Sequence, residues 1–550
     1  MARWPVLAVV FAAAAAAGGA FAQFDPEKVV RETPAVAERY PDPPVRYDTP
    51  AFREGRADFT THAEVMAFAE RLAAGTAHLK LSEAGTSQRG RPVPLLTLTA
   101  QGRIDPALPT VLVIGQQHGN EPAGGEAVLA LAQLFAGPRS GLLDRVNLLL
   151  LPRANPDGAE AFVRTTPNGI DVNRDHLLLR TPEGQAIADV LARHRPQVVL
   201  DLHEFTVAGR WIEKFGALQK VDAQLQPATV GNLDPGLSAA TRREFVERLH
   251  AAWATQGYSS DDYQTGSSDP KDRVVSMGGV QPDTGRNTAG LRPAVSLLVE
   301  VRGIGLGRAH LLRRVHAHVV AAASVIDTAA ALGPRLLALV EQAGRDTAAQ
   351  ACQGELVIAA RHSNTRRRIV LLDPRSGADL PLEVDWRAAE PLQVERTRPR
   401  PCGYLFDAAQ APAALERLHL LGARWQRVAV PGRWAVERYV VGAEASGQRQ
   451  DSRGAIDDGG GPPVRLLQVR TEAADEPIGA GMVYVPLDQP LAGLIAAALE
   501  PDSQNSFAAN HLLDLDMARL RRVMQRPPAQ ALGDPVKPSS INAGCTTTFP

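Results

Sequence analysis

The chain has 550 residues, a formal net charge of −1, 45% hydrophobic residues and 22% charged residues. This length exceeds one typical folding core, so two or more domains are expected. The composition is that of an ordinary globular protein, and the near-zero charge favours neither nucleic acid nor an anionic membrane surface as a partner.

The first 22 residues have the pattern of a secretory signal. A short positive region with Arg3 precedes an apolar run over 6–17, and Ala20-Phe-Ala22 is a small-x-small cleavage site. A membrane anchor is the alternative, but the run is short and rich in alanine, and no other stretch approaches a transmembrane length. We therefore predict export to the periplasm or the medium, with no integral membrane segment after cleavage.

Export permits disulfides, and three cysteines are present: Cys352, Cys402 and Cys545. Cys352 with Cys402 is one possible bridge, although the sequence leaves the pairing open. None of the three lies near the candidate site described below. A thiol nucleophile or a cysteine-ligated zinc is therefore not expected.

The segment after the signal predicts an arm followed by a helix and two strands. Residues 23–58 combine prolines and charges with little periodicity, which is typical of an extended arm. Thr61-His-Ala-Glu64 has the pattern of a capping box for a helix that ends near Ala74. Residues 79–81 and 93–98 predict two strands joined by a turn that contains glycine.

The stretch from Thr110 to Val128 carries the first candidate site. Residues 110–114 predict a buried strand, Gly115 ends it, and His118 and Glu121 follow before an apolar helical pattern. Open α/β sheets place ligands at the carboxyl ends of their strands. An imidazole and a carboxylate suit zinc, which in catalytic sites takes three protein ligands and a water. A helix-start glutamate and a surface histidine are the alternative on this stretch alone.

Further polar residues follow later strands, which we predict over 146–151, 198–202 and 295–301. Asp201 and His203 point to the same face of their strand, so Asp201 is a candidate to orient the histidine, as is another acid such as Asp157. A carboxylate in an apolar strand is costly without a partner. Glu300 is therefore either paired, for instance with Arg302, or catalytic.

The order of these motifs resembles the zinc metallocarboxypeptidases of the carboxypeptidase A type, over roughly 61–332. The matching elements, in chain order, are His118-x-x-Glu121, Asn155-Pro-Asp157-Gly158, Arg164, Asn173-Arg174, His203 and Glu300. The resemblance implies one Zn²⁺ per chain, held by His118, Glu121 and His203, and a peptide or protein C-terminus as substrate. It also implies that Glu300 is the general base, which passes a proton from the attacking water to the leaving amine.

The resemblance also assigns substrate contacts. Arg164 matches the residue that steadies the oxyanion, and Asn173 with Arg174 matches the pair that binds the terminal carboxylate, for which the planar guanidinium is well suited. A solvated Arg164 and an Arg174 neutralised by Asp175 are the alternatives.

The loop before Glu300 is less defined. Arg286 and Asn287 lie where a loop would enter the cleft and are candidates for substrate binding. Tyr258 and Tyr263 lie in the region of the family's substrate-capping tyrosine, but neither is in a recognisable motif. We expect helices over 177–195, 238–257 and 309–332, an irregular loop over 208–234 and a long loop over 258–290.

Beyond residue 333 a helical stretch to about Gly354 gives way to short strand candidates separated by turns. They are 355–360, 368–372, 380–384, 393–396, 426–430, 434–441 and 464–470, with one helix at 411–421. No catalytic constellation is found there. The fold class that we predict is α/β, with a mixed, mostly parallel sheet covered by helices on both faces, plus a smaller β-rich C-terminal domain.

The predicted organisation has five segments: a signal peptide 1–22, an N-terminal arm 23–58, a catalytic domain 59–335, a β-rich accessory domain 350–475, and a C-terminal segment 476–550 that packs back on the catalytic domain.

The predicted function is that of a zinc-dependent metallocarboxypeptidase. The alternatives are a zinc amidase similar to aspartoacylase or succinylglutamate desuccinylase, a cell-wall peptide hydrolase, and an inactive binding module of the same fold. Asn155-Pro-Asp157-Gly158, the signal and the late Glu300 favour the peptidase over the amidase. The three metal ligands together with Glu300 argue against the binding module.

Overall fold

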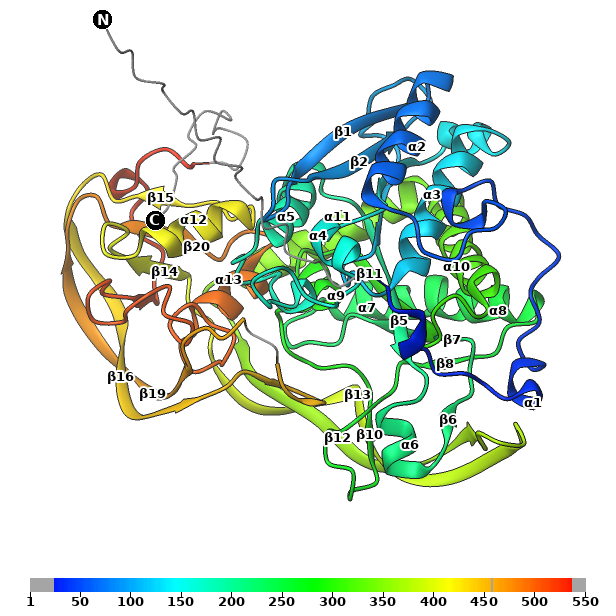
Figure 1. Cartoon of the computed structure of the whole chain (residues 1–550). Coiled ribbons are helices and arrows are strands. Elements are labelled where there is room, and N and C mark those ends of the chain that lie inside the picture. The colour runs from blue at the N-terminus through cyan, green and yellow to red at the C-terminus, as the bar shows by residue number, and fades with distance from the viewer. Residues whose placement is uncertain (1–23, 457–458, 537–550) are drawn as a thin grey trace, which may run out of the picture.

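The computed structural model describes residues 24–456 and 459–536, so the signal sequence and Cys545 lie outside the described residues. An α/β region carries one large sheet, and a separate sheet-rich region is built from the C-terminal part of the chain (Figure 1). Short helices, α1 (Pro34–Ala37), η1 (Pro26–Lys28) and η2 (Pro50–Phe52), interrupt the N-terminal segment.

The large sheet has eight strands in the order β1-β2-β4-β3-β5-β11-β7-β8. The pairs from β4 to β11 and the β7–β8 pair are parallel, whereas β1–β2, β2–β4 and β11–β7 are antiparallel. The mixed, mostly parallel sheet is thereby confirmed. The strands are β1 (Leu79–Thr86), β2 (Pro92–Leu98), β3 (Thr110–Gly115), β4 (Asn147–Leu151), β5 (Val198–Thr206), β7 (Ala223–Pro227), β8 (Ser260–Asp262) and β11 (Val295–Ile304).

Helices cover both faces of this sheet, and the alternation of side chains along β3 shows why. Val111 and Val113 belong to the apolar cluster formed with α3 and α10, while Leu112 and Ile114 belong to the cluster formed with α5. A strand that is buried on both faces is apolar at every position. The helices are α2 (His62–Gly75), α3 (Pro122–Ala136), α4 (Pro156–Ala161), α5 (Pro182–His194), α7 (Pro235–Thr241), α8 (Glu247–Thr255), α9 (Gly285–Gly290), α10 (Leu311–Leu332) and α11 (Pro334–Ala349).

Two helix starts illustrate what the local sequence specifies. The capping box of α2 is confirmed, because the Thr61 side chain accepts from the Glu64 amide and Glu64 accepts from the Thr61 amide. The prediction that a helix begins at 177 was wrong. The Thr181 hydroxyl caps the Gly184 amide, and α5 begins at the next residue, Pro182.

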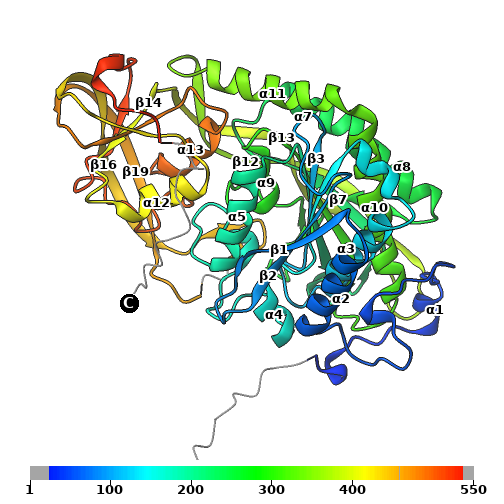
Figure 2. The ribbon, with the colours of Figure 1, turned by 90° about the horizontal axis from the view of Figure 1, so that it is seen from above.

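Helix α10 is long and apolar enough to cross a membrane by length and composition alone, which the sequence prediction overlooked. In the structure 61% of its apolar window is buried, and the helix packs against α3 and α8 (Figure 2). It therefore has the packing of a core helix.

The loops predicted over 208–234 and 258–290 contain more regular structure than expected. They hold α6 (Arg210–Phe215), β6 (Leu218–Gln219), β9 (Thr265–Gly266) and β10 (Val274–Ser276), as well as β7, β8 and α9. Strand β7 escaped prediction because Gln224 and Gln226 alternate with its apolar residues. Both glutamines are fully buried and hydrogen-bonded, to Gln219 and Thr229 respectively.

The four short strands predicted between 355 and 396 are two long ones, β12 (Glu355–Leu372) and β13 (Asp379–Pro399). They form a hairpin, in which β12 also pairs with β6 and β13 also pairs with β10. Charged runs such as Arg366-Arg367-Arg368 interrupt the apolar pattern, whereas backbone pairing with the partner strand continues through them. The hairpin therefore shares a five-stranded sheet with segments of the α/β region.

A six-stranded sheet, β15-β20-β14-β21-β16-β19, completes the C-terminal region. Helix α12 of this region contacts α5 of the α/β region (Figures 1 and 2). The Cys352–Cys402 disulfide forms as one of the expected possibilities. The remaining elements are β14 (Gly403–Phe406), α12 (Pro412–Leu420), β15 (Gln426–Arg427), β16 (Gly432–Gly447), β17 (Gln450–Asp451), β18 (Gly454–Ala455), β19 (Val464–Ile478), β20 (Val483–Pro486), α13 (Ala492–Leu499) and β21 (Arg521–Val523).

Candidate active site

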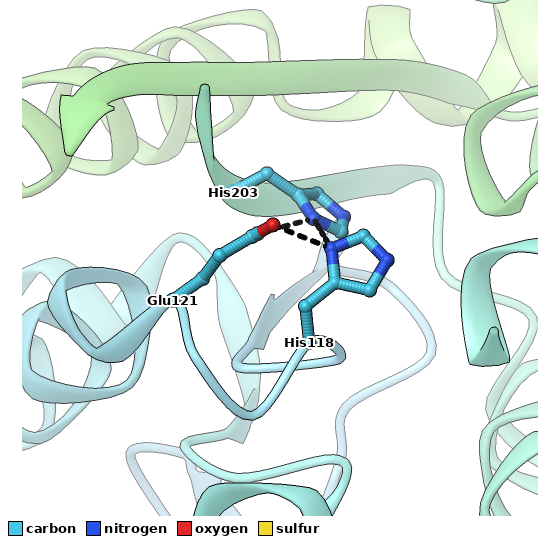
Figure 3. A group of neighbouring side chains, drawn as sticks. All are labelled: His118, Glu121 and His203. Carbon is cyan, nitrogen blue, oxygen red and sulfur yellow. Dashed lines mark hydrogen bonds and ion pairs between the residues drawn. The ribbon is translucent and has the colours of Figure 1, made fainter. Parts of the chain in front are cut away.

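Three side chains converge at the carboxyl ends of β3 and β5. His118 lies after β3, Glu121 immediately precedes α3, and His203 lies on β5, which continues beyond the predicted end to Thr206. The Nδ1 atoms of the two histidines are 3.0 Å apart, and the Glu121 carboxylate lies 2.7 Å from His118 Nδ1 and 2.9 Å from His203 Nδ1 (Figure 3). All three residues are buried. The structure thus brings the three predicted ligands together.

A second carboxylate holds the far side of each imidazole. Asp171 Oδ1 lies 3.0 Å from His118 Nε2, and Asp201 Oδ2 lies 2.9 Å from His203 Nε2. Such carboxylates fix the ring orientation of metal-binding histidines. Asp201 is one of the two acids considered from the sequence. The other, Asp157, accepts from the Arg89 amide and pairs with Arg91 instead.

The donor set fits a zinc ion. Two imidazole nitrogens and a carboxylate oxygen are ligands that zinc prefers, and three protein ligands leave one position open. The three donor atoms lie within 4.8 Å of one another. Among the described residues no fourth histidine, cysteine or acid joins this group, as expected for a catalytic rather than a structural site.

Glu300 lies on β11, directly beside His203 in the register of the parallel β5–β11 pair. Burial raises its pKa to about 8; His203 opposes this shift and Glu121 adds to it. In the part of the chain that the structure describes, its carboxylate makes no hydrogen bond or ion pair. The expected alternative partner, Arg302, pairs with Glu32 and lies over the Tyr40 ring. A buried carboxylate without a direct partner is unusual unless it has a chemical role.

Arg164 lies beside the triad. Its Nε and Nη2 atoms donate to Asp171 at 3.0 and 2.8 Å, and Nη1 lies 3.4 Å from Glu121 Oε1. Asp171 therefore holds both a histidine and this arginine. The arrangement places a guanidinium at the edge of the predicted metal site, so the solvated alternative does not describe this side chain.

Arg174 lines the same cleft, but its anionic partner comes from far along the chain. Its Nη2 donates to Asp451 Oδ2 at 2.6 Å. The partner considered from the sequence, Asp175, instead accepts from the amides of Arg180 and Thr181. Asn173 also lines the cleft, with its amide nitrogen 3.1 Å from His203 Nε2.

The residues predicted to bind substrate from the loops before β11 differ in whether they reach the cleft. Arg286 is buried and lines the cleft. Asn287 does not line it, because its side chain donates to the carbonyls of Gly279 and Gln281 and accepts from the Thr229 amide. Of the two tyrosines, Tyr263 lines the cleft, and burial raises its pKa to about 12. Tyr258 packs under Arg313, away from the site.

The cleft also contains residues that the sequence did not single out. They include Arg210, Gln219, Gln264, Thr265, Ser452 and Arg453. Ser452 and Arg453 come from the C-terminal region, where no motif pointed to a site. Asp171, by contrast, lies in the segment Asp171-Val-Asn173-Arg174, seven positions after Arg164. That closeness in sequence was the available signal that Asp171 pairs with Arg164.

Known proteins resemble this chain in sequence. The profile of the family described as "Zinc carboxypeptidase" matches residues 65–184. "Carboxypeptidase 2" of Trichophyton equinum is 27% identical over 467 residues, covering 83% of this chain and 85% of the relative. "Carboxypeptidase 2" of Trichophyton rubrum is 28% identical over 469 residues, with the same coverage.

Among solved structures, a metallo-carboxypeptidase from Pseudomonas aeruginosa is 22% identical, with a TM-score of 0.37, and the match covers 50% of this chain and 70% of that one.

Proposed function

The chain belongs to the zinc carboxypeptidase family and is a zinc-dependent hydrolase that carries one Zn²⁺, and from this premise we propose how its own residues release the C-terminal residue of a peptide. His118, Glu121 and His203 hold the ion. When bound, zinc supplies a Lewis acid that polarises the scissile carbonyl and promotes ionisation of the attacking water. The observation that supports the proposal most strongly is the unpaired Glu300 carboxylate beside His203.

Glu300 is the general base. Its carboxylate accepts a proton from the attacking water and passes it to the nitrogen of the leaving residue. Burial raises the pKa of Glu300 to about 8, which favours donation of the proton in the second step. With zinc bound, the pKa of Glu300 would be lower, because the neighbouring cation stabilises the charged carboxylate.

Arg164 and Arg174 act on charge. Arg164, held by Asp171, stabilises the negative charge that develops on the carbonyl oxygen. Arg174 and Asn173 bind the free carboxylate of the substrate, and Tyr263 covers the terminal residue. A guanidinium that is already fixed by Asp451 loses little conformational freedom on binding.

Export is a further part of the proposal. The N-terminal pattern of a cleavable signal supports it, and so does the Cys352–Cys402 disulfide, since such bonds persist in oxidising compartments. Sequencing of the mature protein from its native host should begin at Gln23. An intact N-terminus on the native protein would contradict export through this signal.

The experiment that tests the activity compares three substrates: a short peptide with a free C-terminus, its C-terminal amide, and a small N-acetylated amino acid. Mass spectrometry should show stepwise loss of C-terminal residues from the first and little change in the second. Rapid hydrolysis of the third, with the peptide left intact, would favour the amidase alternative.

Arg174→Ala refines this test. It should lower kcat/KM for the free acid by about 10- to 100-fold, the scale of a charged hydrogen bond, and barely change residual cleavage of the amide. Arg366→Ala is the matched control, because Arg366 is an exposed arginine on β12. An equal loss on both substrates would show that Arg174 does not bind the carboxylate.

A further inference from the structure

The tight β17–β18 hairpin of the C-terminal region reaches the catalytic cleft. Ser452 and Arg453, in its turn, line the same cleft as His118 and Glu300. The turn is held in place by the Ser268 amide, which donates to the Arg453 carbonyl at 3.1 Å. Gly454 adopts φ +126°, a backbone conformation that favours glycine, and its Cα lies close to Ser268.

Two ion pairs anchor the hairpin to the α/β region. Arg449 pairs with Asp283, and both side chains are 0% exposed. Asp283 also accepts from the side-chain Nδ2 of Asn505 at 2.6 Å, which connects the segment after α13 to the same ion pair. Asp451 pairs with Arg174 at 2.6 Å. The hairpin is therefore a built part of the cleft wall.

Asp451 serves two cations at once. Its Oδ2 atom accepts from Arg174 Nη2 at 2.6 Å and from Arg453 Nη2 at 3.0 Å. These three groups together therefore carry a net positive charge. Arg174 and Arg453 both line the cleft, with their side chains 11% and 27% exposed.

Another arginine increases the excess of positive charge in the cleft. Arg286, also on the cleft wall, is buried and its Nε has no hydrogen-bond partner. Burial and repulsion by Arg174 lower its pKa to about 10, as expected for a guanidinium short of counter-charge. Among the carboxylates that line the cleft, Glu121 is held by the two histidines and Glu204 by Arg314, and Glu300 is the one assigned to the chemistry.

Five arginines line the cleft, Arg164, Arg174, Arg210, Arg286 and Arg453. One substrate carboxylate, bound by Arg174, does not neutralise the positive charge of these arginines. A second anionic group, on the side chain of the same C-terminal residue, would. A basic terminal side chain would be repelled, and an apolar one would desolvate Arg174 and Arg453, which share a single carboxylate.

We propose that Arg453 is a specificity-determining residue that, together with Arg286, selects peptides whose C-terminal residue has an acidic side chain. The inference rests on the proposed carboxypeptidase function. Arg174 binds the terminal carboxylate, and Arg453 binds the side-chain carboxylate of aspartate or glutamate. The C-terminal region thereby sets which residue is released.

The test uses the full-length, zinc-loaded enzyme and three peptides that differ only in the last residue: Glu, Gln or Lys. Glu and Gln have nearly the same shape, so their comparison isolates the charge. The parent should cleave the Glu peptide with a kcat/KM about 10- to 100-fold above the Gln peptide, the scale of a charged hydrogen bond, and the Lys peptide most slowly. This comparison needs no variant.

Arg453→Gln should reduce the advantage of the Glu peptide over the Gln peptide at least 10-fold, mainly by raising KM for the Glu peptide. Arg453→Glu should shift the preference toward Lys. Arg433→Gln is the control, because Arg433 forms an exposed pair with Asp475, in which both side chains are 63% exposed. Zinc content and the melting temperature of each variant report on folding.

The outcomes are separable. If the parent cleaves no free-acid peptide, the proposed function fails. If it cleaves Glu and Gln peptides equally well, the function stands and the selectivity inference is overturned. An equal loss on all three peptides in Arg453→Gln would also overturn it, because Arg453 would then support the terminal carboxylate or the fold rather than selectivity.

Discussion

The metal centre and the arginine-rich wall of the cleft are assembled from very different distances along the chain. His118 and His203 are 85 positions apart and lie at ends of neighbouring strands in one sheet. Arg174 and Asp451 are 277 positions apart and join two regions. The difference suggests a division of labour, in which the sheet holds the chemistry and a late hairpin adjusts which substrate reaches it. Perturbing each part separately tests that division.

Loss of the metal should have the largest effect. Chelation, or His203→Ala, should abolish peptide hydrolysis while leaving most secondary structure intact, because the ligands decorate strand ends of a sheet whose core is apolar. Zinc analysis and circular dichroism report the two properties. His250→Ala is the control, because His250 lies on α8 and contacts Ser260 of β8 rather than the metal site. Tight zinc binding by His203→Ala would contradict the ligand assignment.

Glu300→Gln should separate chemistry from binding within the metal centre. The amide keeps the size of the side chain but does not accept a proton at neutral pH, so kcat should fall by about a hundred- to ten-thousand-fold. One zinc per chain should remain, and KM for a free-acid peptide should change little. Steady-state kinetics with metal analysis measures both, and near-parent turnover would be incompatible with a general base at this position.

Asp451→Asn tests the wall rather than the chemistry. It leaves the partly buried Arg174 and Arg453 without their shared anion, so the loss of unfolding free energy should approach the roughly 3–5 kcal/mol that breaking a fully buried pair costs. Asp475→Asn breaks an exposed pair and should cost about 0–1 kcal/mol. Urea denaturation of both variants makes the comparison, and equal stabilities would show that the hairpin is not anchored by Asp451.

Zinc binding should release protons at pH 7. Burial lowers the pKa of His203, but Asp201 and Glu121 outweigh it and raise the pKa well above its ordinary value, while burial raises that of Glu300 to about 8. Both groups therefore carry protons in the metal-free protein, and the ion displaces them. Zinc affinity should rise about 10- to 100-fold per pH unit below pH 8. Calorimetry in buffers of different ionisation enthalpy counts the protons, and a count of zero would refute this assignment.

The sequence predicted the metal centre well because each ligand follows a strand whose apolar run is unmistakable. The topology then brings strand ends together, and Asp201 follows from the two-residue period of β5. Family resemblance supplied the functional assignments. That Glu300 lies directly beside His203, however, is known only from the register in which β5 and β11 pair.

The wall of the cleft could not be predicted in the same way. Asp451 and Arg453 sit in a polar turn, and nothing local distinguishes them from a solvated loop. Their role arises from long-range pairing with Arg174. Strand β7 was missed, and the β12–β13 hairpin was predicted only as four short strands, for a related reason. Buried glutamines and charged runs hide an extended backbone whose partners lie elsewhere in the chain. The domain boundaries expected from the sequence stay a prediction.

The most direct measurement is a crystal structure of zinc-loaded Glu300→Gln with a peptide that ends in glutamate. We predict zinc on His118, Glu121 and His203, the terminal carboxylate on Arg174, and the glutamate side chain against Arg453. A peptide whose last residue contacts neither arginine, or a zinc ion held by other side chains, would contradict this prediction.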